Sequence, residues 1–265
     1  MIREYPDGAA FLEENGALLD TQPYLTVFFR LDAPLLKTPD RANYALRAEV
    51  GGEVLLALKT EPFALQLFGS TVPIAETAKH LLNSGYELKT LLGDETLCGA
   101  FAGHLRRTHG IVFEEALAMD FMRATQKTAP SCPSVETPCA ADADEIVDCL
   151  EHFVTDCGLL DKVDPEDVAA HLERFRILRA DGRIVSMASI SRDTDHSRRI
   201  TDVYTRPDCR GKGYARLVVN TAKNEILDAG FDAVLNVDKK NPVSNALYRS
   251  LGFERLFSQG EFRRV

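Results

Sequence analysis

The sequence contains no pair of cysteines at the C-x-x-C spacing, and its cysteines do not cluster with histidines at the spacing of zinc ligands. Disulfide frameworks and structural metal sites both depend on such groupings. The pattern therefore predicts neither a disulfide scaffold nor a metal centre, and it indicates thiols that stay reduced. The six cysteines are Cys98, Cys132, Cys139, Cys149, Cys157 and Cys209.

Long apolar runs are also missing. The N-terminal residues 1–16 carry acids where a signal peptide needs a basic end and an apolar run. No apolar stretch reaches the length that would span a membrane. We therefore expect a soluble, cytoplasmic protein that does not engage a membrane.

The sequence has fewer basic than acidic residues, with 31 Lys and Arg against 40 Asp and Glu, which gives a net charge of −9. Nucleic acids are bound largely through Lys and Arg side chains that release counterions from phosphates. The charge balance therefore predicts no nucleic-acid partner. It favours small-molecule partners, cationic ones in particular, and leaves a homo-oligomer open.

The 265 residues, 45% of them apolar, are enough to form two domains of ordinary size. The clearest break in composition lies over residues 125–145, where three prolines with Ser, Thr and Ala interrupt any helical or strand period. We predict a boundary in this segment, with one domain over residues 1–128 and a second over residues 134–265.

The second half begins with a helical pattern over residues 141–160, and Asp164-Pro165 opens a second short helix. Three short strands should follow as an antiparallel meander, the first two joined by a tight Asp181-Gly182 turn. These strands are predicted over residues 174–180, 183–191 and 198–205. The remaining elements are a helix over 214–230, a strand over 232–238, a helix over 241–251 and a strand over 252–257.

The first half repeats this order of three strands, helix, strand and helix. The strands are predicted over residues 43–50, 53–60, 63–69 and 86–93, and the helices over residues 72–85 and 94–107. The repetition predicts two related folds in tandem, of the α/β class with a mixed sheet.

The stretch "YTRPDCRGKGYARLVV" joins a predicted strand to a predicted helix at residues 204–219. Exposed N–H groups at a helix N-terminus bind anions, and Gly211 and Gly213 would let a pyrophosphate approach the backbone. Arg210 and Lys212 add positive charge. The P-loop pattern and the third glycine of a dinucleotide fingerprint are absent. Glycines alone are equally typical of a simple turn between strand and helix.

The surrounding residues resemble the main cofactor motif of the GNAT superfamily of N-acetyltransferases, R/Q-x-x-G-x-G/A, through Arg210, Gly213 and Ala215. "NPVSNALYRSLGF" at residues 241–253 is similar to that family's second cofactor motif. The resemblance covers residues 134–265. It implies two GNAT-like domains in tandem, each with a mostly antiparallel central sheet flanked by helices. The first half resembles a degenerate GNAT half, because "LFGSTVP" lacks the arginine and the glycine-rich loop, so one acetyl-CoA site is expected per chain.

The resemblance also implies roles for individual residues. Backbone groups of Val203, Tyr204 and Thr205 would hold the thioester and pantetheine arm of coenzyme A. The loop residues Arg210, Gly211, Lys212, Gly213, Tyr214 and Ala215 would hold its pyrophosphate. Asn241 and Ser244 would bind the coenzyme arm, although Asn241 also suits a helix cap. Tyr248 would be the general acid, with packing of the last helix as its alternative.

The general base is marked by no motif. Asp202 on the cofactor strand is the first candidate, and His196 is a weaker one because it suits an exposed loop. Cys209 lies beside the loop without a recognisable base, so it is interpreted as a packing residue.

The predicted function is transfer of acetyl from acetyl-CoA to a primary amine of a small molecule, by direct attack in a ternary complex. Ten acids over residues 142–167 would attract a cationic amine if they line the acceptor side, but a solvated helix face explains them more simply. The alternative function is a non-catalytic acyl-CoA-binding regulatory module. Free-thiol release in the presence of an amine would distinguish the two.

Overall fold

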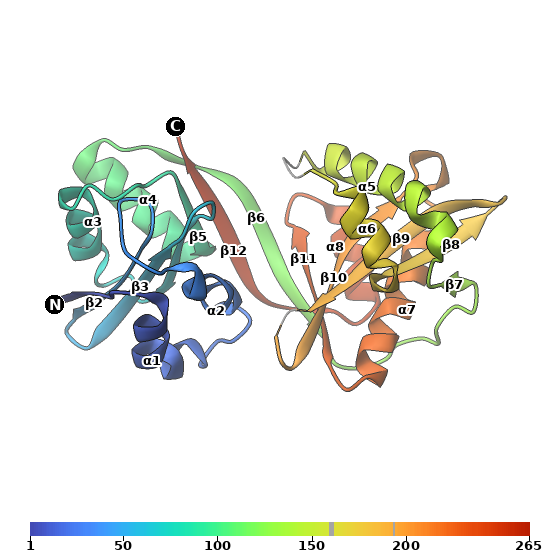
Figure 1. Cartoon of the computed structure of the whole chain (residues 1–265), viewed down its shortest axis with the longest axis horizontal. Coiled ribbons are helices and arrows are strands. Elements are labelled where there is room, and N and C mark those ends of the chain that lie inside the picture. The colour runs from blue at the N-terminus through green and yellow to red at the C-terminus, as the bar shows by residue number, and fades with distance from the viewer. Residues whose placement is uncertain (159–161, 193) are drawn as a thin grey trace. The chain divides into compact units, whose positions relative to one another are not determined.

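The structure is a computed structural model that describes residues 1–158, 162–192 and 194–265. Its residues form two compact units, which we name unit 1 and unit 2 (Figure 1). Unit 1 comprises Met1–Asp120, Asp238–Lys240 and Phe257–Val265, and unit 2 comprises Phe121–Val237 and Asn241–Leu256. In the described residues, no helix is long and apolar enough to cross a membrane.

Unit 2 contains the helices and strands that the sequence predicts for the second half, except the last strand, most of which belongs to unit 1. Its elements are β7 (Val135–Glu136), η2 (Ala140–Asp142), α5 (Ala143–Cys157), α6 (Pro165–Ala170), η3 (Leu172–Arg174), β8 (Phe175–Ala180), β9 (Arg183–Arg192), β10 (Ser197–Thr205), η4 (Pro207–Cys209), α7 (Tyr214–Asp228), β11 (Asp232–Asp238) and α8 (Pro242–Ser250). Strands β8, β9 and β10 form the expected antiparallel meander. Asp181 and Gly182 both have positive φ, as their tight turn requires. The predicted first helix extended to Leu159 and Leu160, which lie outside the described residues.

Unit 1 repeats the same order. Its elements are β1 (Ile2–Glu4), α1 (Gly8–Leu19), α2 (Val27–Asp32), η1 (Ala33–Leu35), β2 (Tyr44–Val50), β3 (Glu53–Lys59), β4 (Leu65–Gly69), α3 (Ile74–Asn83), β5 (Thr90–Asp94), α4 (Glu95–His109) and the first part of β6 (Phe113–Ala124). The predicted strand over 86–93 begins only at Thr90. Residues 84–86 instead complete the end of α3, where Gly85 has positive φ and Tyr86 N–H donates to the Leu81 carbonyl.

The two units differ from a simple repeat in their last strand. β12 (Glu254–Arg264) follows α8, yet its residues Gln259–Arg263 pair antiparallel with Thr90–Asp94 of β5 in unit 1. Phe262 is part of the apolar cluster that β5 and α4 form. In unit 2, β6 takes the place beside β11. The strand predicted over residues 252–257 therefore begins at Glu254 and continues to Arg264, and the residues beyond its predicted end complete the sheet of unit 1.

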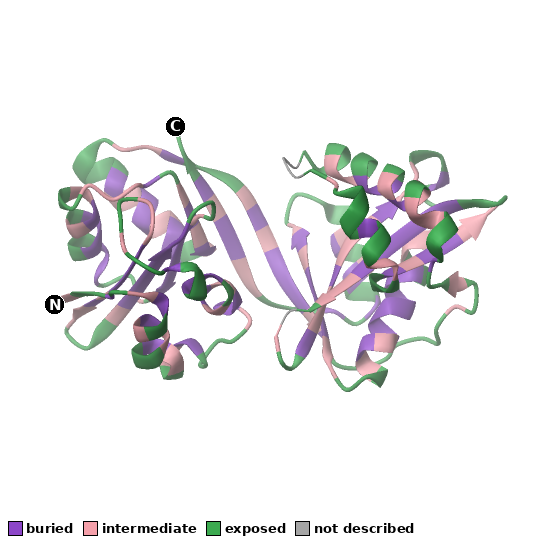
Figure 2. Ribbon diagram, in the orientation of Figure 1, coloured by how far each residue is buried: buried purple, intermediate pink, exposed green. Residues whose placement is uncertain are grey.

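In each unit, helices cover both faces of the part of the sheet that the unit contains. In unit 2, the α7 side of the core includes Val218, Ala222, Ile200 and Leu235. The opposite side is packed by α5 and α6, through Ile146, Leu150, Val168, Ile184 and Met187. Figure 2 shows the strands largely buried, with the outer faces of α5 and α6 exposed. Apolar burial on both faces is what fixes the strand register.

Strand β10 is irregular where it approaches the glycine loop. Its pairing with β9 shifts between Thr201 and Tyr204, and Asp202 has a φ of 50°. Positive φ is uncommon outside glycine, and Asp is one of the residues that tolerate it. Within the described residues, β10 pairs with β11 only over Ser197–Arg199. The end of β10 is thus separated from β11 in unit 2.

A buried lysine ties the two helices beside this region together. Lys223 on α7 is fully buried, and its ammonium donates to the Leu251 carbonyl at 2.7 Å and to Thr128 Oγ1 at 2.9 Å. Leu251 is the C-cap of α8. The amide of the next residue on α7, Asn224, donates to the Ala129 carbonyl at 2.8 Å. Residues 128–129 are therefore held against α7, and α7 is held against the end of α8.

Candidate active site

A cavity of about 720 Å³ lies in unit 2 where β10, α5, α7 and α8 meet. This volume is within the range of small-molecule sites. The cavity is lined by Phe153, Asp156, Cys157, Val203, Tyr204, Thr205, Arg210, Gly211, Gly213, Tyr214, Ala215, Arg216, Asn241, Val243, Ser244, Ala246, Leu247 and Tyr248. The structure thus brings together every residue that the sequence assigned to cofactor binding except Lys212, which is exposed.

The glycine loop leaves open space at the positive end of α7. Gly211 and Gly213 have φ values of 75° and 81°, and a Cβ added to either would meet no atom within 4 Å. Gly213 is the N-cap of α7, where no side chain caps the helix and no acid lies in its first turn. The first N–H groups of α7 are therefore available to an anion, as the helix dipole favours.

Two arginines add positive charge to this cradle. Arg210 is held in place, because its Nε donates to the Thr205 carbonyl at 3.0 Å and its guanidinium pairs with Asp156 at 2.5 Å. Arg216, in the first turn of α7, is exposed. Of the described residues that line the cavity, Asp156 is the only acid. The donor set therefore fits a phosphate-bearing cofactor such as coenzyme A.

Tyr248 lies on α8 and is 6% exposed. Its ring packs edge-on against Phe253, with the ring centroids 6.0 Å apart. Within the described residues, its hydroxyl has no hydrogen-bond partner, although Tyr248 lines the cavity. Burial raises the pKa of this phenol to about 12. The packing role and a role toward a ligand therefore coexist in one side chain.

Asn241 is the N-cap of α8, and its Oδ1 accepts from the Ser244 N–H at 3.0 Å. The same helix end presents Ser244 and Val243 to the cavity. The capping role that the sequence left open for Asn241 is thus observed beside its place in the cavity wall.

Asp202 is not among the described residues that line the cavity, although its neighbour Val203 is. Its Oδ2 accepts from Ser189 Oγ at 2.5 Å, and its Oδ1 accepts from Thr201 Oγ1 at 3.3 Å. Ser189 lies two residues from Met187 on β9, so the two share a face. Met187 packs with Tyr204 under α5. Asp202 therefore lies on the Tyr204 face of the sheet.

Several acids of the 142–167 stretch are held in ion pairs. Asp142 and Glu145 pair with Arg179 at 2.5 and 3.4 Å, and Asp148 pairs with Arg206 at 3.0 Å. Arg206 Nε also donates to the Ile184 carbonyl at 2.7 Å. These contacts anchor α5 to the strand ends, which is a structural use of the acids.

The weaker sequence candidates lie elsewhere. His196 is exposed in the loop before β10. Cys209 is 4% exposed and packs in the core on the α7 side. Sequence reasoning missed Phe153, Asp156, Cys157 and Arg216 as cavity residues. Within the described residues, no group of three or more His, Cys, Asp or Glu could hold a metal ion.

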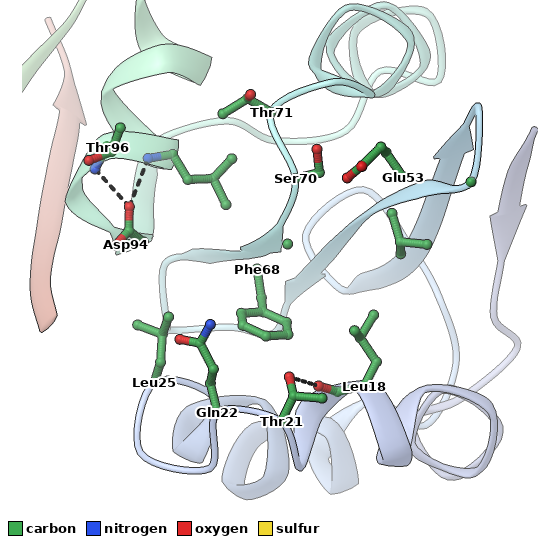
Figure 3. Close-up of a pocket in the computed structure, with 14 residues that line it drawn as sticks. Leu18, Thr21, Gln22, Leu25, Glu53, Phe68, Ser70, Thr71, Asp94 and Thr96 are labelled. Atoms are coloured by element: carbon green, nitrogen blue, oxygen red, sulfur yellow. Dashed lines mark hydrogen bonds between the residues drawn. The ribbon is translucent and has the colours of Figure 1, made fainter. Parts of the chain in front are cut away.

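Unit 1 has a cavity of about 650 Å³ at the corresponding place, between the end of α1, the end of β4 and the start of α4. Figure 3 shows Glu53 and Asp94 at this cavity, with Asp94 accepting from the N–H groups of Thr96 and Leu97. The described lining residues include no Lys, Arg or His. A Cβ on Gly69 would lie 2.2 Å from the Val54 carbonyl oxygen, so this glycine serves close strand packing. The features that fit a pyrophosphate in unit 2 are missing here.

A family model, that of the acetyltransferase (GNAT) family, matches residues 143–253. These residues run from the start of α5 to the residue before β12 and contain all the described residues that line the unit 2 cavity. No curated protein sequence matches the chain.

Solved structures match over nearly the whole chain at low sequence identity. A GNAT acetyltransferase from Colwellia psychrerythraea superposes with a TM-score of 0.59 at 10% identity, covering 100% of this chain and 99% of its own. A GCN5-related N-acetyltransferase from Sphaerobacter thermophilus gives 0.58 at 14% identity, covering 99% of this chain and 94% of its own. A tandem GNAT protein from the clavulanic acid biosynthesis pathway, solved without AcCoA, gives 0.53 at 12% identity, covering 100% and 98%.

At these identities the structural likeness shows the fold, which is the tandem GNAT fold with mixed sheets flanked by helices, as the sequence predicted. The family model and the cavity that fits coenzyme A concern the same segment. Residues 143–253 therefore belong to the acetyltransferase (GNAT) family, and the chain is an acetyl-CoA-dependent acyltransferase.

Proposed function

We propose that unit 2 transfers the acetyl group to a primary amine of a small molecule, by direct attack of the amine in a ternary complex. Bound acetyl-CoA supplies the acetyl thioester. The observation that carries the proposal is that the phenol of Tyr248 lines the cavity together with Val203, whose neighbour on β10 is Asp202. Asp202 precedes Val203 on the Tyr204 face, and the Tyr248 phenol lines the cavity.

The loop and the strand end have separate tasks in this proposal. Arg210 to Arg216 and the first N–H groups of α7 bind the pyrophosphate. Val203 to Thr205 orient the thioester through their backbone groups, and an N–H of this segment stabilises charge on its carbonyl oxygen. Ser186 supports the segment, because its buried hydroxyl donates to the Tyr204 carbonyl at 3.1 Å.

The side chains of Asp202 and Tyr248 transfer protons in this proposal. A primary ammonium with a pKa near 10.4 must lose a proton before it attacks, and the Asp202 carboxylate accepts it. Ser189 and Thr201 hold that carboxylate by their hydroxyls. Tyr248 donates a hydrogen bond or a proton toward the departing sulfur. The acceptor amine approaches from the α5 and α6 face, where Asp202 lies.

The proposal is tested by incubating the full chain with acetyl-CoA and a panel of small primary amines, and by following free thiol with a chromogenic disulfide. We expect thiol release that depends on the amine, together with an N-acetylated product in equal amount by mass spectrometry. Coenzyme binding measured by calorimetry without any amine-dependent release would refute the transfer reaction and support a binding module.

The Asp202→Asn variant should lower kcat/KM for the best amine roughly tenfold at neutral pH, with the Kd for coenzyme A unchanged. Asn also tolerates positive φ, so the bulge should persist. The deficit should shrink as pH rises toward about 10, where the amine loses its proton without a base. Asp208→Asn is the control, because Asp208 is an exposed acid paired with Arg183. A deficit that stays constant with pH would show a structural role only.

The Asp156→Asn variant should tighten coenzyme A binding by up to about fivefold, measured as Kd by calorimetry at low salt. The reason is that Asp156 competes with the pyrophosphate for the Arg210 guanidinium. Asp148→Asn is the matched control, since Asp148 also lies on α5 and pairs with an arginine, but does not line the cavity. Weaker binding in Asp156→Asn would mean that the acid positions Arg210 for the ligand.

A further inference from the structure

One cysteine lines the coenzyme cavity. Cys157 is the last residue of α5 and is exposed, and the six cysteines of the chain form no disulfide. Its neighbour Asp156 pairs with Arg210, so the end of α5 is tied to the loop that binds the pyrophosphate. The Cys157 thiol is therefore held at the wall of the coenzyme cavity.

The Tyr248 hydroxyl is the second feature of this part of the cavity. The side chain is more than nine-tenths buried and lines the cavity, and within the described residues its hydroxyl has no partner. Cys157 lines the same cavity as Tyr248. In the proposed function Tyr248 faces the sulfur of coenzyme A, so the sulfur of a bound coenzyme lies near the Cys157 sulfur.

We propose that Cys157 is a modification site at which the protein forms a mixed disulfide with coenzyme A. This inference rests on the proposed function for the orientation of the coenzyme sulfur. The reagent is the symmetrical disulfide of coenzyme A. The Cys157 thiolate attacks one sulfur of that disulfide, the new bond joins Cys157 Sγ to one coenzyme A sulfur, and the old S–S bond breaks. The second coenzyme A leaves as a thiolate and takes up the proton that Cys157 lost, so no further oxidant is needed.

Proximity drives this reaction. Thiolates are favoured at helix N-termini and near cations, whereas Cys157 lies at a helix C-terminus next to an acid, so its intrinsic reactivity is low. Binding of one nucleotide in the cradle converts the exchange into a reaction between neighbours, which raises its effective concentration. The adduct would block the thioester position while the nucleotide stays bound, and a reducing thiol would reverse it. The modification would thus inhibit acetyl transfer reversibly, according to the redox state of the surrounding thiols.

Cys139 provides a matched comparison within the same chain. It is also exposed and in unit 2, but it does not line the cavity. The reduced full chain is treated with coenzyme A disulfide or with oxidised glutathione, and the adduct on each cysteine is followed by peptide mass spectrometry. With coenzyme A disulfide, Cys157 should react at least about tenfold faster than Cys139. With oxidised glutathione the preference for Cys157 should be absent, because Cys139 caps the N-terminus of η2 whereas Cys157 ends α5 beside an acid. Excess acetyl-CoA should slow only the reaction of Cys157, and Cys157→Ser should abolish that adduct.

Three results would overturn the inference: equal labelling of Cys157 and Cys139 by coenzyme A disulfide, no protection by acetyl-CoA, or the same preference for Cys157 with oxidised glutathione. Calorimetry and the amine assay on the same preparation separate the two proposals. Coenzyme A binding and amine-dependent transfer without selective labelling would refute only the modification site. Selective labelling without transfer to any amine would leave the modification site standing and refute the proposed function.

Discussion

The Tyr248→Phe variant should lower kcat about a hundredfold while the Kd for coenzyme A stays within about twofold of the wild type. The substitution removes only the hydroxyl, which has no partner within the described residues, and keeps the ring that packs against Phe253. The free energy of unfolding should therefore change by less than about 1 kcal/mol. Amine-dependent thiol release under saturating substrates measures kcat, and calorimetry measures the Kd.

The raised pKa of Tyr248 gives this prediction a pH dependence. Burial raises the pKa from about 10 to about 12, so the phenol keeps its proton, and with it its ability to donate, until the pH approaches 12. Simple thiols have a pKa of roughly 8.5, which would make Tyr248 the weaker acid. The same desolvation also raises the pKa of the coenzyme thiol that departs into this cavity. The difference between the pKa of Tyr248 and the pKa of that thiol therefore becomes smaller.

The wild-type rate should therefore show no alkaline decline between pH 8 and about 10 from loss of the Tyr248 proton. Equal kcat in the wild type and in Tyr248→Phe would assign the side chain to packing alone. Leu247→Ala, in the same cavity wall, is a control for general disturbance of α8.

Gly213→Val should weaken coenzyme A binding roughly a hundredfold. A side chain at this position fills the open space over the first N–H groups of α7, where the pyrophosphate would bind. It also forces a β-branched residue to a φ of 81°, which costs about 1–3 kcal/mol of stability. Calorimetric titration with coenzyme A measures the Kd, and urea unfolding measures the stability.

Gly182→Val separates these two effects. Gly182 has a φ of 78° in the turn between β8 and β9, and a Cβ there also meets no atom within 4 Å. The two variants should lose similar stability, but only Gly213→Val should lose coenzyme binding. If both bind coenzyme A with wild-type affinity, the cradle does not hold the pyrophosphate.

The order of helices and strands was predictable from sequence because each element carries a local signal. Apolar periodicity indicated α5 and α7, and the Asp181-Gly182 turn fixed the first hairpin of unit 2. The pairing of β12 with β5 was not predictable, because those residues lie more than 160 positions apart and the predicted strand ended at residue 257, before the paired residues Gln259–Arg263.

The residues of the candidate site that belong to a sequence motif were predictable. The residues that reach the site only through the folding of the chain were not. The loop residues and Tyr248 follow from two motifs, whereas Asp156 and Cys157 reach the cavity because α5 packs across the sheet end. The only sequence signal for the position of Asp156 and Cys157 was their helical spacing from the buried Ile146 and Cys149. Regular strand alternation places Asp202 on the Tyr204 face, but it does not reveal the register shift between Thr201 and Tyr204 or the positive φ of Asp202.

The pairing of β12 with β5 has a consequence for biosynthesis. The edge of β5 and the cluster around Leu97 and Phe101 stay incomplete until Phe262 has been synthesised and has joined them. Domains usually fold as units during translation, N-terminal first. Here unit 1 cannot complete its sheet during translation until the strand that follows unit 2 has been synthesised. An unpaired β5 in the meantime is a free edge that invites pairing with other chains, a hazard that grows with the time needed to synthesise unit 2.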